Sequence, residues 1–293
     1  MSPESPFVLP SPEEGRLAAA DGTRLVYSLF RAEQPRASVI ITHGYAEHRG
    51  RYRYLLEALV SKGVSVLTWD CRGHGESGGV RGTIGRFDIY LEDFAVILRY
   101  GQEVLPTPLF AFGHSMGGLI MTRFFQQRSP AVAGLIVSNP SLGLRMQVPG
   151  WKLTLAKLLS HLVPGFNLPS DIPPELISRD PAEIRRYKDD PLVFGHATAR
   201  WAVEFMAAQD ATIRRPADLA ALPVLVLLGS GDGIADAATS RDFYGRCTAA
   251  SCKIVMYDGF YHELINEGPA HREQVFTDLL AWMDQRIADL ATD

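Results

Sequence analysis

The stretch LFAFGHSMGGLIMTRFFQQ (109–127) contains the pattern G-x-S-x-G around Ser115. An apolar run precedes this serine, and a stretch with helical periodicity follows it directly. The pattern is typical of a serine nucleophile on a sharp strand-to-helix turn, where the flanking glycines are needed because the turn is tight. We therefore expect Ser115 between the carboxyl end of a buried strand and the start of a helix. A buried turn serine is the alternative.

The same pattern occurs a second time in GESGG (75–79), around Ser77. Here the preceding apolar run already ends at Asp70, and the residues that follow, GGVRGTIG, cannot begin a helix. Ser77 therefore lacks the strand-and-helix context that a nucleophile elbow requires. We expect it on a glycine-rich structural loop.

Further from Ser115, short apolar runs alternate with stretches of helical periodicity. Runs that are apolar on both faces are typical of a parallel sheet covered by helices. The sequence thus predicts an α/β fold with a doubly wound, mostly parallel sheet and right-handed crossovers. The strands are expected at 23–30, 37–44, 64–70, 107–113, 133–139, 223–229 and 252–258, and the helices at 52–63, 87–104, 116–129 and 271–290. The first 15 residues hold four prolines and are expected to be extended or loosely ordered.

About eighty residues between the runs at 133–139 and 223–229 interrupt this alternation, which is more than a compact domain usually spends on a loop. We predict an inserted helical cap (lid) over 141–205, with residues 1–140 and 206–293 forming the α/β core.

Two helices are expected in this cap region, at 151–163 and 197–210. The first places five apolar side chains on one face: Trp151, Leu155, Leu158, Leu159 and Leu162. We expect this face to pack onto the core. A lid that docks on lipid surfaces, with Lys152 and Lys157 beside the apolar face, is the alternative.

Composition limits the classes of partner. The chain has 293 residues, 46% of them hydrophobic and 21% charged, as in one large globular domain with or without an insertion. The net charge of −4 gives no electrostatic case for nucleic acid. The three cysteines have no framework spacing, so we expect reduced, mostly buried thiols. We expect neither a secretory signal nor a membrane-spanning segment, and hence a cytoplasmic protein that can be peripheral to membranes through the cap. The oligomeric state is left open.

A nucleophilic serine needs a histidine to take its proton and a carboxylate to orient that histidine. In this class of fold the chain order is serine, then acid, then histidine, each on a loop after a strand. Of the histidines after Ser115, only His262 directly follows an apolar run. The others are placed in the cap or at the start of the last helix: His161, His196 and His271.

The orienting acid should also leave the end of a strand, and GSGDGIAD (229–236) offers two aspartates there. Asp232 comes shortly after the strand and is assigned as the acid. Asp236 is better placed as the N-cap of a helix beginning near Ala237. Asp258 is too close to His262 in sequence to reach its ring easily.

The oxyanion of the intermediate requires hydrogen-bond donors in fixed positions. One should be the N–H of Met116, directly after the nucleophile, and the other an N–H from the loop after an early strand. ITHGYAEH (41–48) is that loop, and Tyr45 is the expected second donor. His43 is read as structural. Glu47 could pair with Arg72 beneath the site or be solvated.

Five segments together resemble the α/β-hydrolase fold, and within it the monoacylglycerol lipase and lysophospholipase-like (serine aminopeptidase S33-like) serine hydrolases. They are HGYAEHRGRY (43–52), DCRGHGESGG (70–79), GHSMGG (113–118), GSGDGIAD (229–236) and YDGFYHELINE (257–267). The resemblance implies Ser115, Asp232 and His262 as triad, the N–H groups of Tyr45 and Met116 as oxyanion donors, and neither metal nor organic cofactor.

The function expected on these grounds is hydrolysis of carboxylic esters of glycerolipids, in particular monoacylglycerols to fatty acid and glycerol, through an acyl-enzyme. A lysophospholipase or general carboxylesterase would use the same machinery. An aminopeptidase of the same fold would need acidic groups for the substrate amine, and Glu175, Glu183 and Glu204 are available in the cap. A catalytically silent binding protein on this scaffold is the alternative from a different class.

Overall fold

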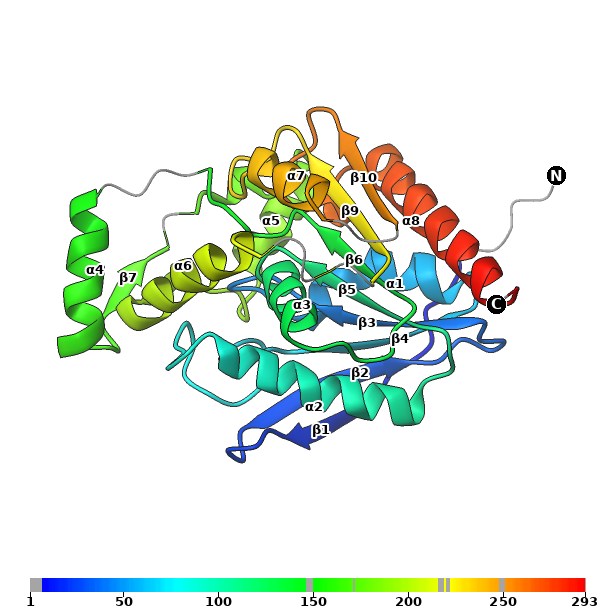
Figure 1. The fold of residues 1–293 in the computed structure, drawn as a ribbon, viewed down its shortest axis with the longest axis horizontal. Helices are drawn as coiled ribbons and strands as arrows, with labels where there is room; N and C mark the ends of the chain where they lie inside the picture. The colour runs from blue at the N-terminus through cyan, green and yellow to red at the C-terminus, as the bar shows by residue number, and fades with distance from the viewer. Residues whose placement is uncertain are drawn as a thin grey trace.

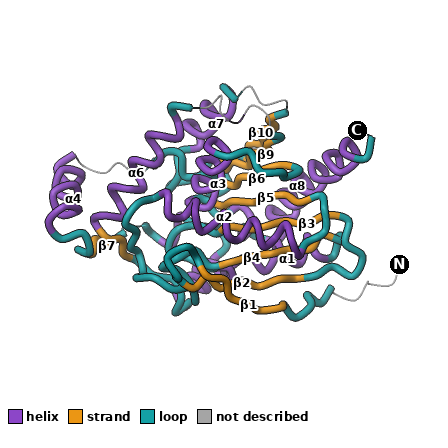
Figure 2. The backbone as a smooth tube through the Cα atoms, turned by 60° about the horizontal axis from the view of Figure 1, so that its bottom comes forward, coloured by secondary structure: helices purple, strands orange, loops and turns teal. Residues whose placement is uncertain are grey.

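The computed structural model describes residues 7–145, 150–170, 172–215, 219, 222–247 and 251–292. Its centre is an 8-stranded sheet in the order β1-β2-β4-β3-β5-β6-β9-β10 (Figures 1 and 2). The strands are β1 (Glu13–Ala18), β2 (Arg24–Phe30), β3 (Ala37–Thr42), β4 (Val64–Trp69), β5 (Leu109–His114), β6 (Gly134–Ser138), β9 (Val224–Gly229) and β10 (Cys252–Tyr257). β2 pairs antiparallel with both of its neighbours, β1 and β4. All other neighbouring strands, from β4 to β10, are parallel.

Helices cover both faces of this sheet (Figure 1). α1 (Arg53–Val60) and α8 (Pro269–Leu290) pack on one face, whereas α2 (Asp88–Val104), α3 (Met116–Gln127) and α7 (Ala237–Gly245) pack on the other. Alternate residues of one strand supply the two cores, so that Val39 and Ile41 face α1 and Ile40 faces α2. The predicted doubly wound fold is therefore confirmed, and the parallel register brings the carboxyl ends of β3, β5, β6 and β9 to one edge.

The seven predicted strands are observed within a few residues of their expected bounds, but β1 was missed. Residues 13–15 were expected to be extended or loosely ordered, and they are extended as the start of the edge strand β1. In this strand Gly15 lies opposite Tyr27, and a Cβ at Gly15 would come within 2.2 Å of that ring. The pairing depends on a glycine that fits one aromatic side chain, and no apolar run marks it.

The described part of the chain between β6 and β9 contains three α-helices. They are α4 (Gly150–Leu162), the unpredicted α5 (Pro181–Asp189) and α6 (Ala199–Ile213), with a small antiparallel pair of β7 (Asn167–Pro169) and β8 (His196–Thr198). The described part of the chain also contains the short 3-10 helices η1 (Arg49–Tyr52), η2 (Pro174–Leu176) and η4 (Leu264–Asn266). α6 begins inside the predicted cap and ends beyond it, and the boundaries of the cap stay a prediction.

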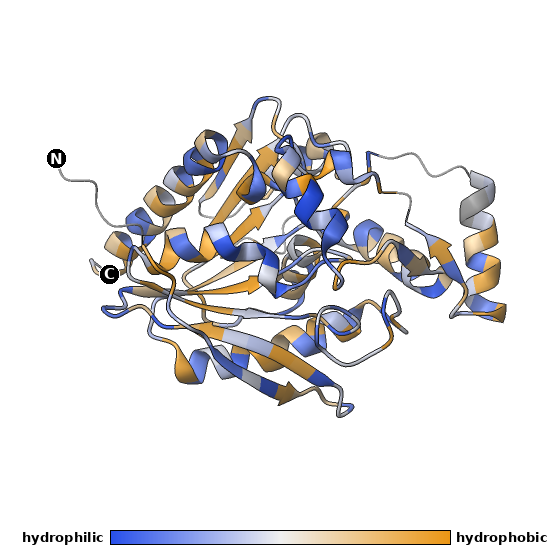
Figure 3. Ribbon diagram, turned by 180° about the vertical axis from the view of Figure 1, so that it is seen from behind, coloured by the Kyte–Doolittle hydropathy of each residue, from blue (hydrophilic) through white to orange (hydrophobic). Residues whose placement is uncertain are grey.

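The expected packing of α4 on the core is wrong. α4 packs against α6 and stands at the end of the molecule away from the sheet (Figures 1 and 3). Among its described side chains, the small residues Ala156 and Ser160 are the buried ones, while Trp151 and Leu162 are 65% and 69% exposed. Leu155 and Leu158 are also exposed, and the side chain of Lys152 lies outside the described residues. No described helix is long and apolar enough to cross a membrane.

Candidate active site

Ser115 occupies a strained turn between β5 and α3. Its φ of +51° and ψ of −115° lie outside the backbone conformations that residues other than glycine usually adopt. The neighbouring glycines make the turn possible, because a Cβ at Gly117 would come within 2.2 Å of the carbonyl oxygen of Thr42, and one at Gly113 within 2.5 Å of that of Gly117. This is the geometry of a nucleophile elbow.

Two side chains from distant loops complete a hydrogen-bonded chain with Ser115. His262 Nε2 lies 2.9 Å from Ser115 Oγ, and His262 Nδ1 lies 2.7 Å from Asp232 Oδ2. Asp232 Oδ1 accepts from the N–H groups of Ile234 and Ala235 at 2.8 and 3.0 Å, which fixes the carboxylate. The three predicted triad residues are thus brought together, and they are all buried.

The environment of His262 favours the proton-accepting role. Burial alone would lower its pKa, but Asp232 outweighs this through its charge and hydrogen bond, and Glu263 adds to the effect. The net result is a pKa above the usual value for histidine. Because an ionised carboxylate only accepts, the neutral ring carries its proton on Nδ1, and Nε2 accepts from the Ser115 hydroxyl.

Sequence reasoning missed Asn139, whose side chain connects the segment after β6 with the loop of His262 and the end of β9. It follows β6 with a φ of +40°. Its Nδ2 donates to the carbonyl oxygens of Tyr261 and His262 at 3.0 and 2.7 Å, and its Oδ1 accepts from the Gly229 N–H at 2.8 Å. One amide therefore holds the histidine loop against the end of β9, from which Asp232 follows. No motif marks this residue, although its place after an apolar run is a weak signal.

The loop after β3 lies beside Ser115. A Cβ at Gly44 would lie 3.2 Å from the Cβ of Ser115, and the Gly44 N–H donates to Glu47 Oε1 at 2.5 Å. The Tyr45 hydroxyl donates to the His196 carbonyl at 2.6 Å, so this side chain is held by the cap region. Met116 opens α3, where the first N–H groups have no intrahelical acceptor. Gly44, which precedes Tyr45, thus lies beside Ser115, and Met116 directly follows it; the oxyanion role of the Tyr45 and Met116 N–H groups stays a prediction.

Neither alternative for Glu47 is observed, because it does not pair with Arg72 and it is buried rather than solvated. Arg72 binds Asp93 and Asp21, while Glu47 Oε2 lies 3.3 Å from Arg51 Nε. Arg51 also donates to Glu263 at 2.6 Å. Burial raises the pKa of Glu47 to about 7, and the charge of Glu263 adds to this. Glu47 therefore belongs to a buried cluster with Arg51 and Glu263.

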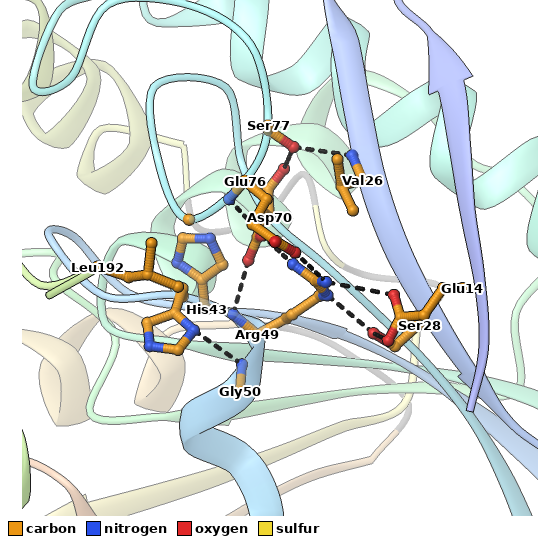
Figure 4. Close-up of polar contacts among 12 residues, drawn as sticks. Glu14, Val26, Ser28, His43, Arg49, Gly50, Asp70, Glu76, Ser77 and Leu192 are labelled. Atoms are coloured by element: carbon orange, nitrogen blue, oxygen red, sulfur yellow. Dashed lines mark hydrogen bonds and ion pairs between the residues drawn. The ribbon is translucent and has the colours of Figure 1, made fainter. Parts of the chain in front are cut away.

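Ser77 is held by main-chain groups, as Figure 4 shows. Its Oγ donates to the Asp70 carbonyl oxygen at 2.6 Å and accepts from the Val26 N–H at 2.8 Å. The Asp70 carboxylate accepts from the N–H groups of Arg49 and Glu76, both at 2.8 Å, and pairs with the Arg49 guanidinium. GESGG is therefore a structural loop.

His43 also serves the structure. Its Nε2 accepts from the Cys71 N–H at 2.9 Å, so its Nδ1 donates to the Gly44 carbonyl oxygen at 2.6 Å. Burial lowers the pKa of His43 to about 3, which keeps the ring neutral. This neutral histidine joins the loop after β3 to the loop after β4.

The remaining candidates lie away from Ser115 or have other partners. Asp236 caps α7 by accepting from the N–H groups of Ala238 and Thr239, as expected. Asp258 accepts from the Ser230 hydroxyl at 2.9 Å. His161 and His271 are exposed on α4 and α8, and His196 lies in β8. The three cysteines were expected to be mostly buried; Cys71 is fully buried, and Cys247 and Cys252 are partly buried.

A strand-to-helix turn bearing a buried serine, followed along the chain by an acid and a histidine at the ends of later parallel strands, defines the α/β-hydrolase class. The chain belongs to the serine aminopeptidase S33 family, whose model matches residues 33–269.

Individual relatives are similar over nearly the whole chain. A monoacylglycerol lipase of Mycolicibacterium smegmatis is 32% identical, and the match covers 92% of this chain and 96% of that protein. A phospholipase of Bacillus subtilis is 29% identical, with 88% of this chain and 99% of the relative covered. The crystal structure of a Paleococcus ferrophilus monoacylglycerol lipase superimposes with a TM-score of 0.81 at 29% identity, covering 89% of this chain and 99% of the other.

Proposed function

We propose that this protein hydrolyses carboxylic esters of glycerolipids, with monoacylglycerols as its main substrates, and releases fatty acid and glycerol. The observation that carries the proposal is the continuous hydrogen-bonded chain from Ser115 through His262 to Asp232, at 2.9 and 2.7 Å. The similarity to monoacylglycerol lipases along nearly the full length supports the substrate class.

The reaction proceeds through an acyl-enzyme. His262 removes the proton of Ser115 as Oγ attacks the ester carbonyl, and then donates that proton to the leaving glycerol. A water molecule next attacks the acyl-enzyme with His262 as the base, and the proton returns to Ser115. Asp232 holds the Nδ1–H tautomer and stabilises the imidazolium that forms in each step. The N–H groups of Tyr45 and Met116 stabilise the oxyanion.

The cap contacts the lipid surface through α4. Its exposed apolar side chains stand beside the exposed cation Lys157, a combination suited to the interface of an anionic bilayer. A lipid ester could then pass from the bilayer to the nucleophile without full exposure to water.

An aminopeptidase activity is less well supported, because the cap carboxylates available for a substrate amine already have partners. Glu175 pairs with Lys188, and Glu183 pairs with Arg186. Glu204 accepts from the Phe87 N–H at 3.2 Å. A lysophospholipase activity is the second candidate, favoured by the phospholipase among the relatives.

The test compares fatty-acid release from a monoacylglycerol and from a lysophosphatidylcholine with the same acyl chain. We expect release from the glyceride, and its loss by at least about 10³-fold in Ser115→Ala. Ser77→Ala is the matched control, because it removes the serine of the second G-x-S-x-G pattern, and it should retain activity per folded molecule. Release mainly from the phospholipid would identify lysophospholipids as the substrate class instead. Activity surviving in Ser115→Ala would refute the assigned nucleophile.

A further inference from the structure

A second serine hydroxyl touches the proposed nucleophile. Ser141, on the segment after β6, places its Oγ 2.9 Å from Ser115 Oγ. It is 3% exposed, so water does not compete freely for this contact. None of the steps described above uses this hydroxyl.

The hydrogen bonds of His262 determine which of the two hydroxyl groups is the donor. His262 Nδ1 donates to Asp232, so Nε2 is an acceptor and the Ser115 hydroxyl must donate to it. Ser115 Oγ then has only lone pairs to offer. The Ser141 hydroxyl is therefore the donor, and Ser115 Oγ is the acceptor.

The main chain holds Ser141 in this position from two sides. Its N–H donates to the Ser115 carbonyl oxygen at 3.0 Å. Its own carbonyl oxygen accepts from Nε2 of Gln209 on α6 at 2.8 Å, and Gln209 is itself buried. The preceding Asn139 and Pro140 further restrict the turn. The contact between the two hydroxyls is thus built into both the core and the cap region.

We propose that Ser141 is a further catalytic residue that speeds the release of the acyl group from Ser115, an inference that rests on the function proposed above. A hydroxyl oxygen that donates to histidine is a good acceptor, and it becomes a stronger one as it gains negative charge. The Ser115 Oγ of an acyl-enzyme is an ester oxygen, whose lone pairs are delocalised into the carbonyl group and accept weakly. The bond from Ser141 is therefore weakened by acylation and regained on deacylation.

In deacylation the water oxygen bonds to the acyl carbon while His262 takes the water proton. The bond from that carbon to Ser115 Oγ then breaks, its electron pair goes to Oγ, and His262 returns the proton there. Ser141 keeps its own proton throughout and donates its hydrogen bond to the departing oxygen. This stabilises the step in which Ser115 is the leaving group, and it gives no such advantage to acylation.

The test is Ser141→Ala in rapid-mixing kinetics with a p-nitrophenyl ester, where the burst reports acylation and the steady state reports deacylation. We expect the ratio of the deacylation to the acylation rate constant to fall about 5-fold, the effect of one neutral hydrogen bond. Mass spectrometry of the intact, acid-quenched protein should show a larger acylated fraction in Ser141→Ala than in the wild type.

Two variants complete the comparison. Ser138→Ala removes a nearby buried hydroxyl that has no hydrogen-bond partner within the described residues, and it should leave the ratio unchanged. Ser141→Thr keeps a hydroxyl and should restore the ratio toward the wild-type value. An unchanged ratio in Ser141→Ala, or equal losses in both rate constants, would overturn the proposal for Ser141. Failure of the proposed function is a separate result, because the wild type itself would then not become acylated on Ser115.

Discussion

Burial acts to lower the pKa of four histidines of this protein, but the net shift differs among them. Burial lowers the pKa of His43, His74 and His114 to about 3 each, so these rings stay neutral at every physiological pH. His262 is equally buried, yet its pKa is raised, because Asp232 is hydrogen-bonded to its ring. One carboxylate therefore separates the proposed base from three structural rings.

Asp232→Asn should change both the size of kcat/KM and its dependence on pH. Without the carboxylate the favoured tautomer is lost, and we expect kcat/KM to fall by roughly 10³–10⁴-fold. The base must be neutral, so activity falls as pH drops through the pKa of His262. Because Asp232 raises that pKa, the acid limb of the remaining activity should move to lower pH.

The measurement is kcat/KM for a short soluble ester between pH 4.5 and 9, with Asp258→Asn as the matched control. Asp258 is exposed and bonds only Ser230 among the contacts described for its carboxylate, so this variant should retain the wild-type profile. An acid limb that stays in place in Asp232→Asn would contradict the role given to this carboxylate.

Between elements, a single guanidinium joins two loops of the site. Arg51 in η1 pairs with Glu47 of the loop after β3 and with Glu263, which directly follows His262. All three side chains are buried. The loop of the expected oxyanion donor and the loop of the histidine are therefore tied through one cation, and each carboxylate depends on it.

Arg51→Met should lower the free energy of unfolding by about 3–5 kcal/mol at pH 8, because it leaves two carboxylates buried without a cation. Burial already raises the pKa of Glu47 to about 7. A raised folded-state pKa contributes stability below the unfolded value near 4.5, which is lost as pH rises through the folded value. The deficit of Arg51→Met should therefore shrink as pH falls from 8 toward 5.

Denaturant unfolding of both proteins at several pH values gives this comparison. Arg53→Met is the matched control, since Arg53 pairs with Glu57 on the surface with its side chain 75% exposed. It should cost at most about 0.5 kcal/mol at any pH. Equal losses in the two variants would mean that the buried cluster contributes no more than a surface pair.

The sequence predicted elements that have local patterns and missed contacts that only the fold creates. The parallel strands are apolar on both faces, so their runs are visible without a partner. The positions of Ser115, Asp232 and His262 follow from where those runs end. Asn139 also stands at the end of such a run, but only the fold shows which loops it joins, and Ser141 has no such signal because its partners are distant along the chain. The orientation of α4 was wrong because periodicity identifies an apolar face but not what covers it.

For the whole molecule, the cap region is joined to the site by α6. Trp201 on this helix lies against the ring of Tyr45 with centroids 3.8 Å apart, and Gln209 further along it holds the Ser141 carbonyl oxygen. α4 packs against the same helix and carries the exposed apolar residues. A lipid surface bound by α4 would therefore be linked through α4 and α6 to both the loop of Tyr45, the expected oxyanion donor, and Ser115, the proposed nucleophile.

The proposed docking of α4 predicts that Trp151→Ser combined with Leu162→Ser weakens binding to anionic vesicles by at least about 10-fold. Each of these exposed side chains would transfer substantial apolar area from water into the interface. Sedimentation with vesicles measures the binding, and hydrolysis of a vesicle-embedded monoacylglycerol should fall in parallel. Hydrolysis of a short soluble ester should be unchanged, because neither residue contacts the site.

Leu290→Ser is the matched control for this double variant. Leu290 ends α8 at the opposite end of the molecule from α4 and is also exposed (Figure 1). If any exposed apolar residue promotes adsorption, this change should weaken vesicle binding as well, and if α4 is the docking helix it should not. Equal effects of the two changes, or a double variant that loses activity on the soluble ester to the same degree, would count against docking and favour a structural role for the apolar face of α4.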